Sequence, residues 1–311
     1  MSNKFAGCFP AVVTAFKEEG SRRTHPINYD AMDMLVEHVA KGGVTGVVVA
    51  GCTGAASVLN HNEQVSLVNH IQSNFGKELV VVAGDGSNST EEAVKLAQRM
   101  ESEAGVFAHL SISPYYNKPS DEGLVQHYTE IADNIEGELI LYSVPGRTGG
   151  KGILPAVAAR LSEHPRIVGI KEASGDIDRI KETIRIVRDR NFFVTSGDDG
   201  KTLDIMAAGG VGAISVAANI IPGRMSKMVD LALNGKYLEA RGIEHANSGI
   251  YDALFPKSEH GSPSPNPVLC YYALKKIGIP VGTPRLPLTD AVHYEKEFMD
   301  RALAKMKLAG K

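Results

Sequence analysis

The sequence predicts a (β/α)8 barrel with a C-terminal helical extension, and three observations lead to this fold class. Eight short apolar runs rich in valine and isoleucine alternate with segments of helical periodicity. The runs recur about every 25–35 residues, the size of one βα unit. Apolar residues fill nearly every position of each run, as in parallel strands covered by helices. Eight such units in about 220 residues match a closed barrel.

The expected strands follow one another up to residue 219. They span 6–16, 44–51, 79–86, 106–113, 138–145, 167–174, 192–199 and 211–219. Between them, 29–39, 65–71 and 177–187 place apolar side chains on one helical face. An open doubly wound sheet would predict a dinucleotide fingerprint after the first strand, and residues 14–17 do not form one. The closed barrel is therefore the preferred fold.

Beyond residue 219 the strand pattern ends and helices are expected. They cover 222–233, 237–254, 267–277 and 290–306, and a proline-rich link at 261–267 precedes the third. We assign residues 1–235 to a catalytic barrel and 236–311 to a helical appendage on it.

Composition and charge exclude several classes of protein. The chain has 33 Lys+Arg against 36 Asp+Glu and no basic run. It therefore lacks the concentration of positive charge typical of proteins that bind nucleic acid or an anionic membrane. No apolar stretch approaches the roughly 20 residues of a membrane span. The three cysteines, Cys8, Cys52 and Cys270, are too few and too widely spaced for a disulfide framework. We expect a cytoplasmic protein without nucleic-acid or membrane partners.

Polar residues follow the expected strands at their C-terminal ends, where barrels of this type carry their active sites. Lys171 closes an apolar strand, so it should face a poorly hydrated mouth, where desolvation lowers the pKa of an amine. A neutral lysine can attack a carbonyl and form a Schiff base. A lysine that pairs with a barrel carboxylate is the alternative.

Other residues at this mouth supply complementary chemistry. Tyr142 ends the neighbouring strand, where its phenol can relay protons or simply be a satisfied core hydroxyl. Thr53 and the N–H groups of Gly54 and Ala55 form either an anion cradle or a plain turn before a helix. Arg147 offers a planar donor fork for a carboxylate, or is a solvated loop arginine.

Metal and thiol chemistry have little support. The ten histidines form no H-E-x-x-H motif and no cluster at metal-ligand spacing, so we expect no metal. Cys52 as a nucleophile would need a base that the sequence does not identify. Asp198 and Asp199 are expected to cap the following helix, and the glycines of 209–212 to pack closely rather than to hold phosphate.

Five motifs stand in order at the expected strand ends. They are Gly51-Cys52-Thr53-Gly54, Ser113-Pro114-Tyr115-Tyr116-Asn117-Lys118-Pro119, Tyr142-Ser143-Val144-Pro145-Gly146-Arg147-Thr148-Gly149, Gly169-Ile170-Lys171-Glu172-Ala173 and Ser196-Gly197-Asp198-Asp199. Together they resemble the pyruvate-dependent class I aldolases typified by dihydrodipicolinate synthase and N-acetylneuraminate lyase. The resemblance covers nearly the whole chain, from Phe5 to Pro287.

The resemblance implies catalytic roles for four residues. Lys171 would form a Schiff base with pyruvate, and Tyr142 would shuttle protons. Tyr116 would reach into a neighbouring subunit's site, which implies a homodimer, usually doubled to a homotetramer. Cys52 stands where the family usually has a threonine that links two tyrosine hydroxyls. Because a thiol donates and accepts only weakly, this relay should be slower or bridged by water.

The resemblance also implies the substrates. Thr53, Gly197 and the backbone near Ile214 would hold pyruvate. Arg147 is similar to an arginine of the synthase branch that binds the carboxylate of aspartate 4-semialdehyde. The expected reaction is the cofactor-free condensation of pyruvate with L-aspartate 4-semialdehyde to 4-hydroxy-tetrahydrodipicolinate, which feeds lysine and diaminopimelate synthesis. A sister aldolase or dehydratase for 2-keto-3-deoxy sugar acids and a non-catalytic keto-acid sensor stay open.

Two departures and one regulatory hypothesis complete the comparison. Ala55 occupies a position where the family usually has a glutamate. The family's motif Asn-Pro-x-Pro-Val-Lys appears in this chain as Asn266-Pro267-Val268-Leu269-Cys270-Tyr271. Gln64 stands where lysine-sensitive synthases often have a second histidine. The positions that match their inhibitor site are Ser57, His61, Asn88, Glu92 and Tyr115. Lysine feedback is therefore a further hypothesis.

Overall fold

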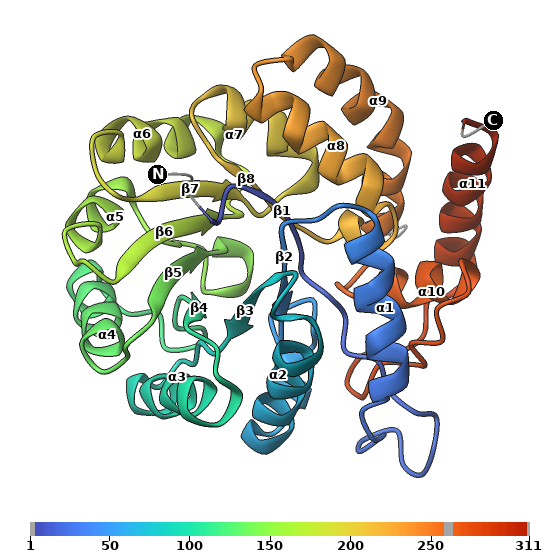
Figure 1. Cartoon of the computed structure of the whole chain (residues 1–311), viewed down its shortest axis with the longest axis horizontal. Helices are drawn as coiled ribbons and strands as arrows, with labels where there is room; N and C mark the ends of the chain where they lie inside the picture. Colours follow the sequence, from blue (N-terminus) through green and yellow to red (C-terminus); the bar gives the residue numbers. More distant parts are fainter. Residues whose placement is uncertain (1–3, 258–263, 310–311) are drawn as a thin grey trace.

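The computed structural model describes residues 4–257 and 264–309, which form a ring of parallel strands surrounded by helices (Figure 1). The strands are β1 (Gly7–Pro10), β2 (Gly46–Val49), β3 (Val80–Gly84), β4 (Ala108–Ile112), β5 (Glu138–Ser143), β6 (Ile167–Glu172), β7 (Phe193–Ser196) and β8 (Gly212–Ser215). Each lies within an expected run and is shorter than it, because the ends of the runs leave the sheet as loops. The predicted (β/α)8 barrel is confirmed.

Hydrogen bonds order the strands β1-β8-β7-β6-β5-β4-β3-β2, and every pairing is parallel. A bridge from Ala11 to Val48 and a hydrogen bond from the Thr45 N–H to the Cys8 carbonyl, 3.0 Å long, close the ring between β1 and β2. Since all strands run the same way, their C-terminal ends gather at one mouth.

Eight helices alternate with the strands. They are α1 (Tyr29–Lys41), α2 (His61–Phe75), α3 (Thr90–Ala104), α4 (Asp121–Asp133), α5 (Pro155–Leu161), α6 (Ile177–Val187), α7 (Thr202–Ala207) and α8 (Pro222–Leu233). Polar caps set several of their starts. Asn60 accepts from the Glu63 N–H while the Glu63 carboxylate accepts from the Asn60 N–H, a capping box that begins α2. The three predicted helical faces coincide with α1, α2 and α6.

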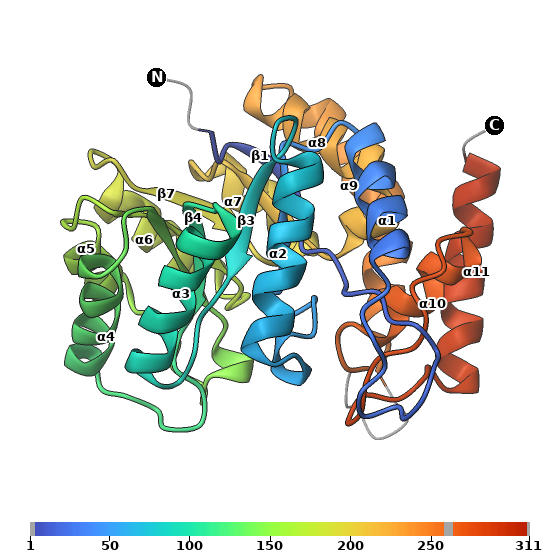
Figure 2. The same ribbon diagram turned by 60° about the horizontal axis from the view of Figure 1, so that its bottom comes forward.

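Three further helices, α9 (Tyr237–Leu254), α10 (Val268–Lys276) and α11 (His293–Ala309), lie on the side of the barrel that carries α1 and α8 (Figures 1 and 2). Helix α11 begins later than the predicted 290 and runs on past 306. Residues 258–263, which include part of the predicted proline-rich link, lie outside the described residues. A domain boundary near residue 235 stays a prediction.

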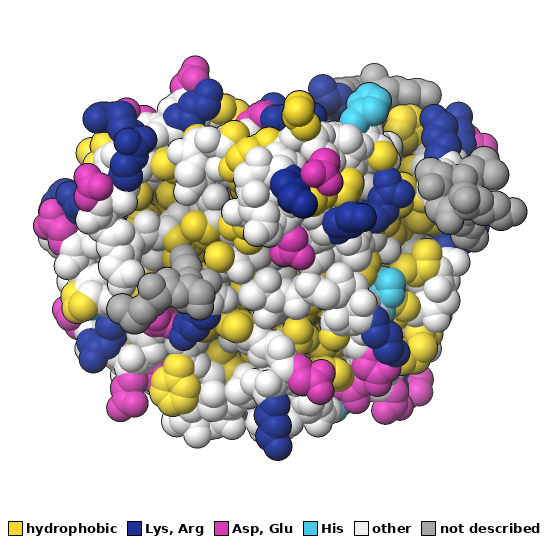
Figure 3. Space-filling view, turned by 45° about the horizontal axis from the view of Figure 1, so that its top comes forward, with side chains coloured by type: hydrophobic (Ala, Val, Ile, Leu, Met, Phe, Trp, Pro, Cys, Tyr) yellow, Lys and Arg dark blue, Asp and Glu magenta, His cyan; other side chains and the backbone are white. Residues whose placement is uncertain are grey.

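The surface shows no large patch of one charge on the face drawn in Figure 3, where acidic and basic side chains intermix. Among the helices described here, none is long and apolar enough to cross a bilayer.

A bulge in β6 sets the direction of its last residues. Leu139 pairs with Ile167, but the next residue, Ile140, pairs with Gly169, so β6 carries one extra residue at Val168. Side chains of a regular strand alternate between faces. Because of the extra residue, Val168 packs in the barrel interior while Ile170 packs against the helices. The following residue, Lys171, therefore returns to the interior.

His109 of β4 forms a buried ionic network with Asp85 and Glu101. Its Nδ1 lies 2.5 Å from an Asp85 carboxylate oxygen and its Nε2 lies 3.2 Å from Glu101 of α3. Glu101 also accepts the Gly137 N–H just before β5, at 2.7 Å. Burial alone would lower the pKa of His109, but the two carboxylates outweigh it and raise the pKa to about 9. The network ties β3, β4 and β5 to α3.

We expect the His109→Gln substitution to cost more stability at low pH than at high pH. The folded pKa of about 9 exceeds the ordinary value of 6.5, so the stabilisation is complete below 6.5 and is lost as pH rises through 9. Urea unfolding should show a loss on the order of 3 kcal/mol near pH 6 and much less near pH 9.5. His293→Gln, at a side chain that is 89% exposed, is the control. A pH-independent difference would contradict the ion pair.

Candidate active site

Lys171 lies at the mouth end of β6, opposite Tyr142 of β5 in the sheet register. Its ammonium nitrogen lies 4.2 Å from the centroid of the Tyr142 ring, and the residue is 5% exposed. Burial, with a smaller contribution from Arg147, lowers the pKa of Lys171 to about 8, although Cys52 and Asp199 oppose the shift. A substantial fraction of the amine is therefore neutral near physiological pH.

Tyr142 stays a protonated phenol at neutral pH. Burial is the main cause that raises its pKa well above the ordinary range, and the neighbouring Cys52 adds to the shift. The hydroxyl can therefore give a proton to a reacting group and take it back.

Gly197, directly after β7, leaves room for the Lys171 side chain. A Cβ at this position would lie 2.9 Å from Lys171 Cε and 2.8 Å from Ala173 Cβ, closer than side chains pack. Ile214 of β8 is buried in the same barrel interior as Tyr142. Of these two residues, Gly197 directly contacts the Lys171 side chain.

Thr53 follows β2 and is 3% exposed. Its Oγ1 accepts a hydrogen bond of 3.0 Å from Asn266 Nδ2. Within the described part of the chain, the N–H groups of Thr53 and Gly54 have no protein acceptor, whereas the Ala55 N–H donates to the Cys52 carbonyl at 3.1 Å. The predicted cradle is thus corrected in one position: Ala55 closes a turn and is not free for an anion.

Asp198 and Asp199, which follow β7, have different structural roles. Asp198 accepts from the Gly200 N–H at 3.1 Å and caps the short 3-10 helix Asp199–Lys201, as predicted. Asp199 does not cap it. Its carboxylate accepts from Ser215 Oγ at 2.5 Å and from the Ala217 N–H at 2.8 Å. The prediction for Asp199 was wrong because its partners come from the end of β8 and the loop that follows it, far away in sequence.

A cavity of about 460 Å³ opens at these strand ends. Its walls include Cys52, Tyr142 and Arg147, and Asn266 and Leu288 from the C-terminal segments. Arg147 ends the 3-10 helix Pro145–Arg147, is exposed and has no ion pair within the described residues. Its guanidinium is therefore available to a carboxylate in the cavity.

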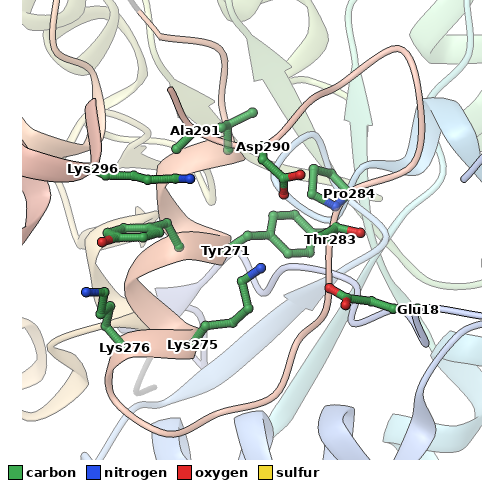
Figure 4. Close-up of a pocket in the computed structure, with 11 residues that line it drawn as sticks. Glu18, Tyr271, Lys275, Lys276, Thr283, Pro284, Asp290, Ala291 and Lys296 are labelled. Atoms are coloured by element: carbon green, nitrogen blue, oxygen red, sulfur yellow. The ribbon is translucent and has the colours of Figure 1, made fainter. Parts of the chain in front are cut away.

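A second cavity, of about 500 Å³, lies in the C-terminal region (Figure 4). Lys275 and Lys296 line it together with the acidic Glu18 and Asp290. Among the described residues it shares no lining residue with the cavity at the strand ends, and Lys171 does not line it.

Tyr116 does not join the other candidate residues within the single chain. It is 92% exposed and has a φ of 74°, a left-handed conformation that is strained for a tyrosine. The loop therefore presents this ring outward at a conformational cost.

The candidate regulatory residues only partly share the cavity. Ser57, His61 and Tyr115 line it, and His61 Nδ1 lies 3.6 Å from the Glu92 carboxylate. Asn88 does not line it and contributes its carbonyl to Asn117 instead. Gln64 uses its amide nitrogen on the Ala56 and Leu59 carbonyls, at 3.0 and 3.2 Å, and so fastens the wall of the cavity.

Arg285 holds the C-terminal wall of the cavity and was not expected from the sequence. The residue is 4% exposed, and its guanidinium donates to both Glu63 oxygens, at 2.6 and 2.9 Å. It also donates to the His25 carbonyl at 2.6 Å and to the Val58 carbonyl at 2.9 Å. The Arg285 hydrogen bond is the main cause that lowers the pKa of Glu63. In the sequence, only the segment Arg-Leu-Pro-Leu at 285–288 could have drawn attention to Arg285.

In residues 4–257 and 264–309, no group of three or more His, Cys, Asp or Glu side chains is placed to hold a metal ion. The polar groups around Lys171 instead combine an amine, a phenol and hydrogen-bond donors. This set suits imine chemistry on a carbonyl compound that carries a carboxylate.

Comparison with known proteins supplies the family. The model of the dihydrodipicolinate synthetase family matches residues 4–306. The chain belongs to this family. The resemblance carried by the five motifs is thereby confirmed, as is the prediction of a class I aldolase-type lyase.

Relatives within the dihydrodipicolinate synthetase family match over most of their length. The 4-hydroxy-tetrahydrodipicolinate synthase of Methanospirillum hungatei is 39% identical over 301 residues, 97% of this chain and 99% of that protein. A dihydrodipicolinate synthase structure from Thermotoga maritima has a TM-score of 0.91 at 32% identity and covers 98% of this chain and 100% of that one. The chloride-inhibited synthase from Acinetobacter baumannii, complexed with pyruvate, has a TM-score of 0.90 at 35% identity, covering 97% and 99%.

Proposed function

We propose that this enzyme condenses pyruvate with L-aspartate 4-semialdehyde to 4-hydroxy-tetrahydrodipicolinate through a Schiff base on Lys171. The observation that carries the proposal is a buried amine of lowered pKa placed 4.2 Å from the Tyr142 ring. Relatives that match along most of their length bear the name of this synthase, and one was solved with pyruvate.

The chemistry follows from the two side chains. The neutral Lys171 amine adds to the C2 carbonyl of pyruvate, and the carbinolamine loses water to give the imine. Tyr142 protonates the departing hydroxyl and later takes a proton back. Loss of a methyl proton gives an enamine, whose carbon attacks the aldehyde. The amino group of the semialdehyde then adds to the imine carbon, closes the ring and releases the Lys171 amine. Thr53 with the adjacent N–H groups holds the pyruvate carboxylate, and Arg147 binds the carboxylate of the semialdehyde.

The complete enzyme is a homodimer or homotetramer in the cytoplasm. The outward-facing, strained Tyr116 supports this part of the proposal, because a partner subunit would bury the ring and use its hydroxyl. Ile214 and Gly197 complete the pyruvate pocket from below. No cofactor takes part in the proposed reaction.

Two assays test the function. Borohydride added with pyruvate should reduce the imine and add the keto acid irreversibly to Lys171, as peptide mass spectrometry will show. Turnover with L-aspartate 4-semialdehyde should then follow. Adduct formation with turnover only on 2-keto-3-deoxy sugar acids would identify a sister aldolase, and an adduct without any turnover would identify a sensor. Labelling of another side chain would refute the mechanism.

The Cys52→Thr substitution should keep or raise turnover. Cys52 lines the cavity beside Tyr142, and a hydroxyl donates and accepts hydrogen bonds better than a thiol. We expect kcat to be unchanged or up to about tenfold higher, a modest share of what proton transfer contributes. Cys52→Ala, which removes the group altogether, is the matched comparison. A large loss in the threonine variant would mean that the thiol has a chemical role of its own.

L-Lysine should inhibit weakly, if the regulatory hypothesis holds. Ser57, His61 and Tyr115 line the reaction cavity, but the Gln64 amide is already occupied by two carbonyls. We expect inhibition only at millimolar lysine, measured in the coupled synthase assay. His61→Ala should relieve it. Full activity at millimolar lysine would end the hypothesis without affecting the proposed reaction.

A further inference from the structure

We propose that Asn266 is a positioning residue that fixes the Thr53 hydroxyl as a hydrogen-bond donor to the carboxylate of the keto acid. The inference rests on the proposed function, since it concerns the pocket for pyruvate. Asn266 comes from the segment that leads into α10, so the C-terminal extension takes part directly in the site.

The contact is short and enclosed. Asn266 Nδ2 donates to Thr53 Oγ1 at 3.0 Å. Thr53 is buried, and Asn266 lies in the wall of the cavity. Cys52, the residue before Thr53, lines the same cavity, so the contact lies at the edge of the cavity wall.

The direction of this bond determines what the hydroxyl can do next. A threonine hydroxyl has one proton to donate and two lone pairs. Accepting from Asn266 uses a lone pair and leaves the proton for another acceptor. In the part of the chain that the structure describes, the Thr53 O–H meets no protein acceptor, and the N–H groups of Thr53 and Gly54 meet none either. The Thr53 O–H and these two N–H groups are thus three donors without a protein acceptor among the described residues, an arrangement that suits an anion.

A closed set of hydrogen bonds holds Asn266 in place. Tyr271, one turn into α10, donates its hydroxyl to the Thr14 carbonyl at 2.6 Å. The Thr14 hydroxyl donates to the Gly54 carbonyl at 2.6 Å. The same two segments that meet at Asn266 and Thr53 are therefore joined a second time, on the far side of the turn. This second tie fixes the distance between the amide and the hydroxyl.

Asn266→Asp is the decisive substitution, because it keeps the shape and replaces the donor by an acceptor. The Thr53 hydroxyl would then donate to Asp in position 266, and its lone pairs and the new charge would face the substrate carboxylate. We expect the pyruvate concentration that gives half-maximal borohydride trapping to rise at least about tenfold, the equivalent of about 1.4 kcal/mol. Asn266→Ala, which only removes the donor, should raise it about threefold. The KM for the aldehyde should stay unchanged.

Two controls separate polarity from added charge and from general disruption. Asn69→Asp adds the same charge on the exposed face of α2 and should leave trapping unchanged. The Thr53→Val variant has no hydroxyl to reorient. In this background, the additional rise in the half-maximal pyruvate concentration that Asn266→Asp causes relative to Asn266→Ala should shrink to less than half. Equal effects of the two Asn266 variants, or an undiminished penalty with Val at position 53, would overturn the inference. Because trapping needs pyruvate alone, a failure with the aldehyde would count only against the proposed synthase reaction.

Discussion

The Lys171→Met variant will form no pyruvate adduct and will lose turnover by on the order of 10⁴-fold or more. Methionine keeps the unbranched apolar stem of the side chain as far as the position of Cε, so the buried contacts with Gly197 are largely retained. The loss should therefore be chemical, with the free energy of unfolding close to that of the wild type. Borohydride trapping, kcat and thermal unfolding measure the three expectations.

The wild-type pH profile provides a second readout of the same amine. Since burial lowers the pKa of Lys171 to about 8, trapping at low pyruvate should increase as pH rises through about 8 and level off above it. Lys181→Met, an exposed position on α6 after the same strand, is the control and should behave as wild type. Residual trapping on the Lys171→Met protein would show that another nitrogen carries the imine.

Replacing Arg285 by methionine will destabilise the fold more than any surface substitution. The change leaves Glu63 without its partner and two carbonyls, those of His25 and Val58, without donors. Removing one member of a fully buried ion pair costs about 3–5 kcal/mol. Because the Glu63 side chain is 27% exposed and keeps some contact with water, we expect a loss at the lower end of this range, about 3 kcal/mol. Urea unfolding should report this loss, and turnover should fall as well, because Val58 and Leu288 line the reaction cavity.

Lysine at position 285 should not rescue the Arg285 variant. Its single ammonium cannot contact two carboxylate oxygens and two carbonyls at once, as the planar guanidinium does. Arg188→Met, at an exposed arginine, should change the free energy of unfolding by less than about 0.5 kcal/mol. A double-mutant cycle with Glu63→Gln isolates the pair, and a coupling near zero would show that the carbonyl contacts carry the stability instead.

The fold was predictable because its signal is local. Each strand is recognisable as a short run of valine and isoleucine, and each intervening helix by its one apolar face. No information about contacts between distant residues is therefore needed to predict these elements. Lys171 was predictable for the same reason: it ends an apolar strand, and a strand end in a barrel of this type lies at the mouth. The bulge that turns it inward was not visible in the sequence.

Contacts between distant segments were not predictable from spacing. His109 finds Asp85 and Glu101 only because three elements converge behind β4. Asp199 was expected to cap a helix, but it accepts hydrogen bonds from the end of β8 and the loop that follows. Local pattern carries no information about such partners, which depend on tertiary packing. The same holds for Asn266, which lies more than 200 positions away from Thr53 in the chain.

The extra residue at Val168 has a consequence for anyone who transplants this chemistry to another scaffold. A strand with ordinary alternation would point the amine of position 171 at the helices, where no ketone can reach it. Grafting the lysine onto a strand without the bulge would thus yield an inactive protein, even though all the catalytic residues were present. Deleting Val168 here, by contrast, should leave a regular strand that still points the amine inward, because Lys171 would then follow Ile167 by three positions instead of four.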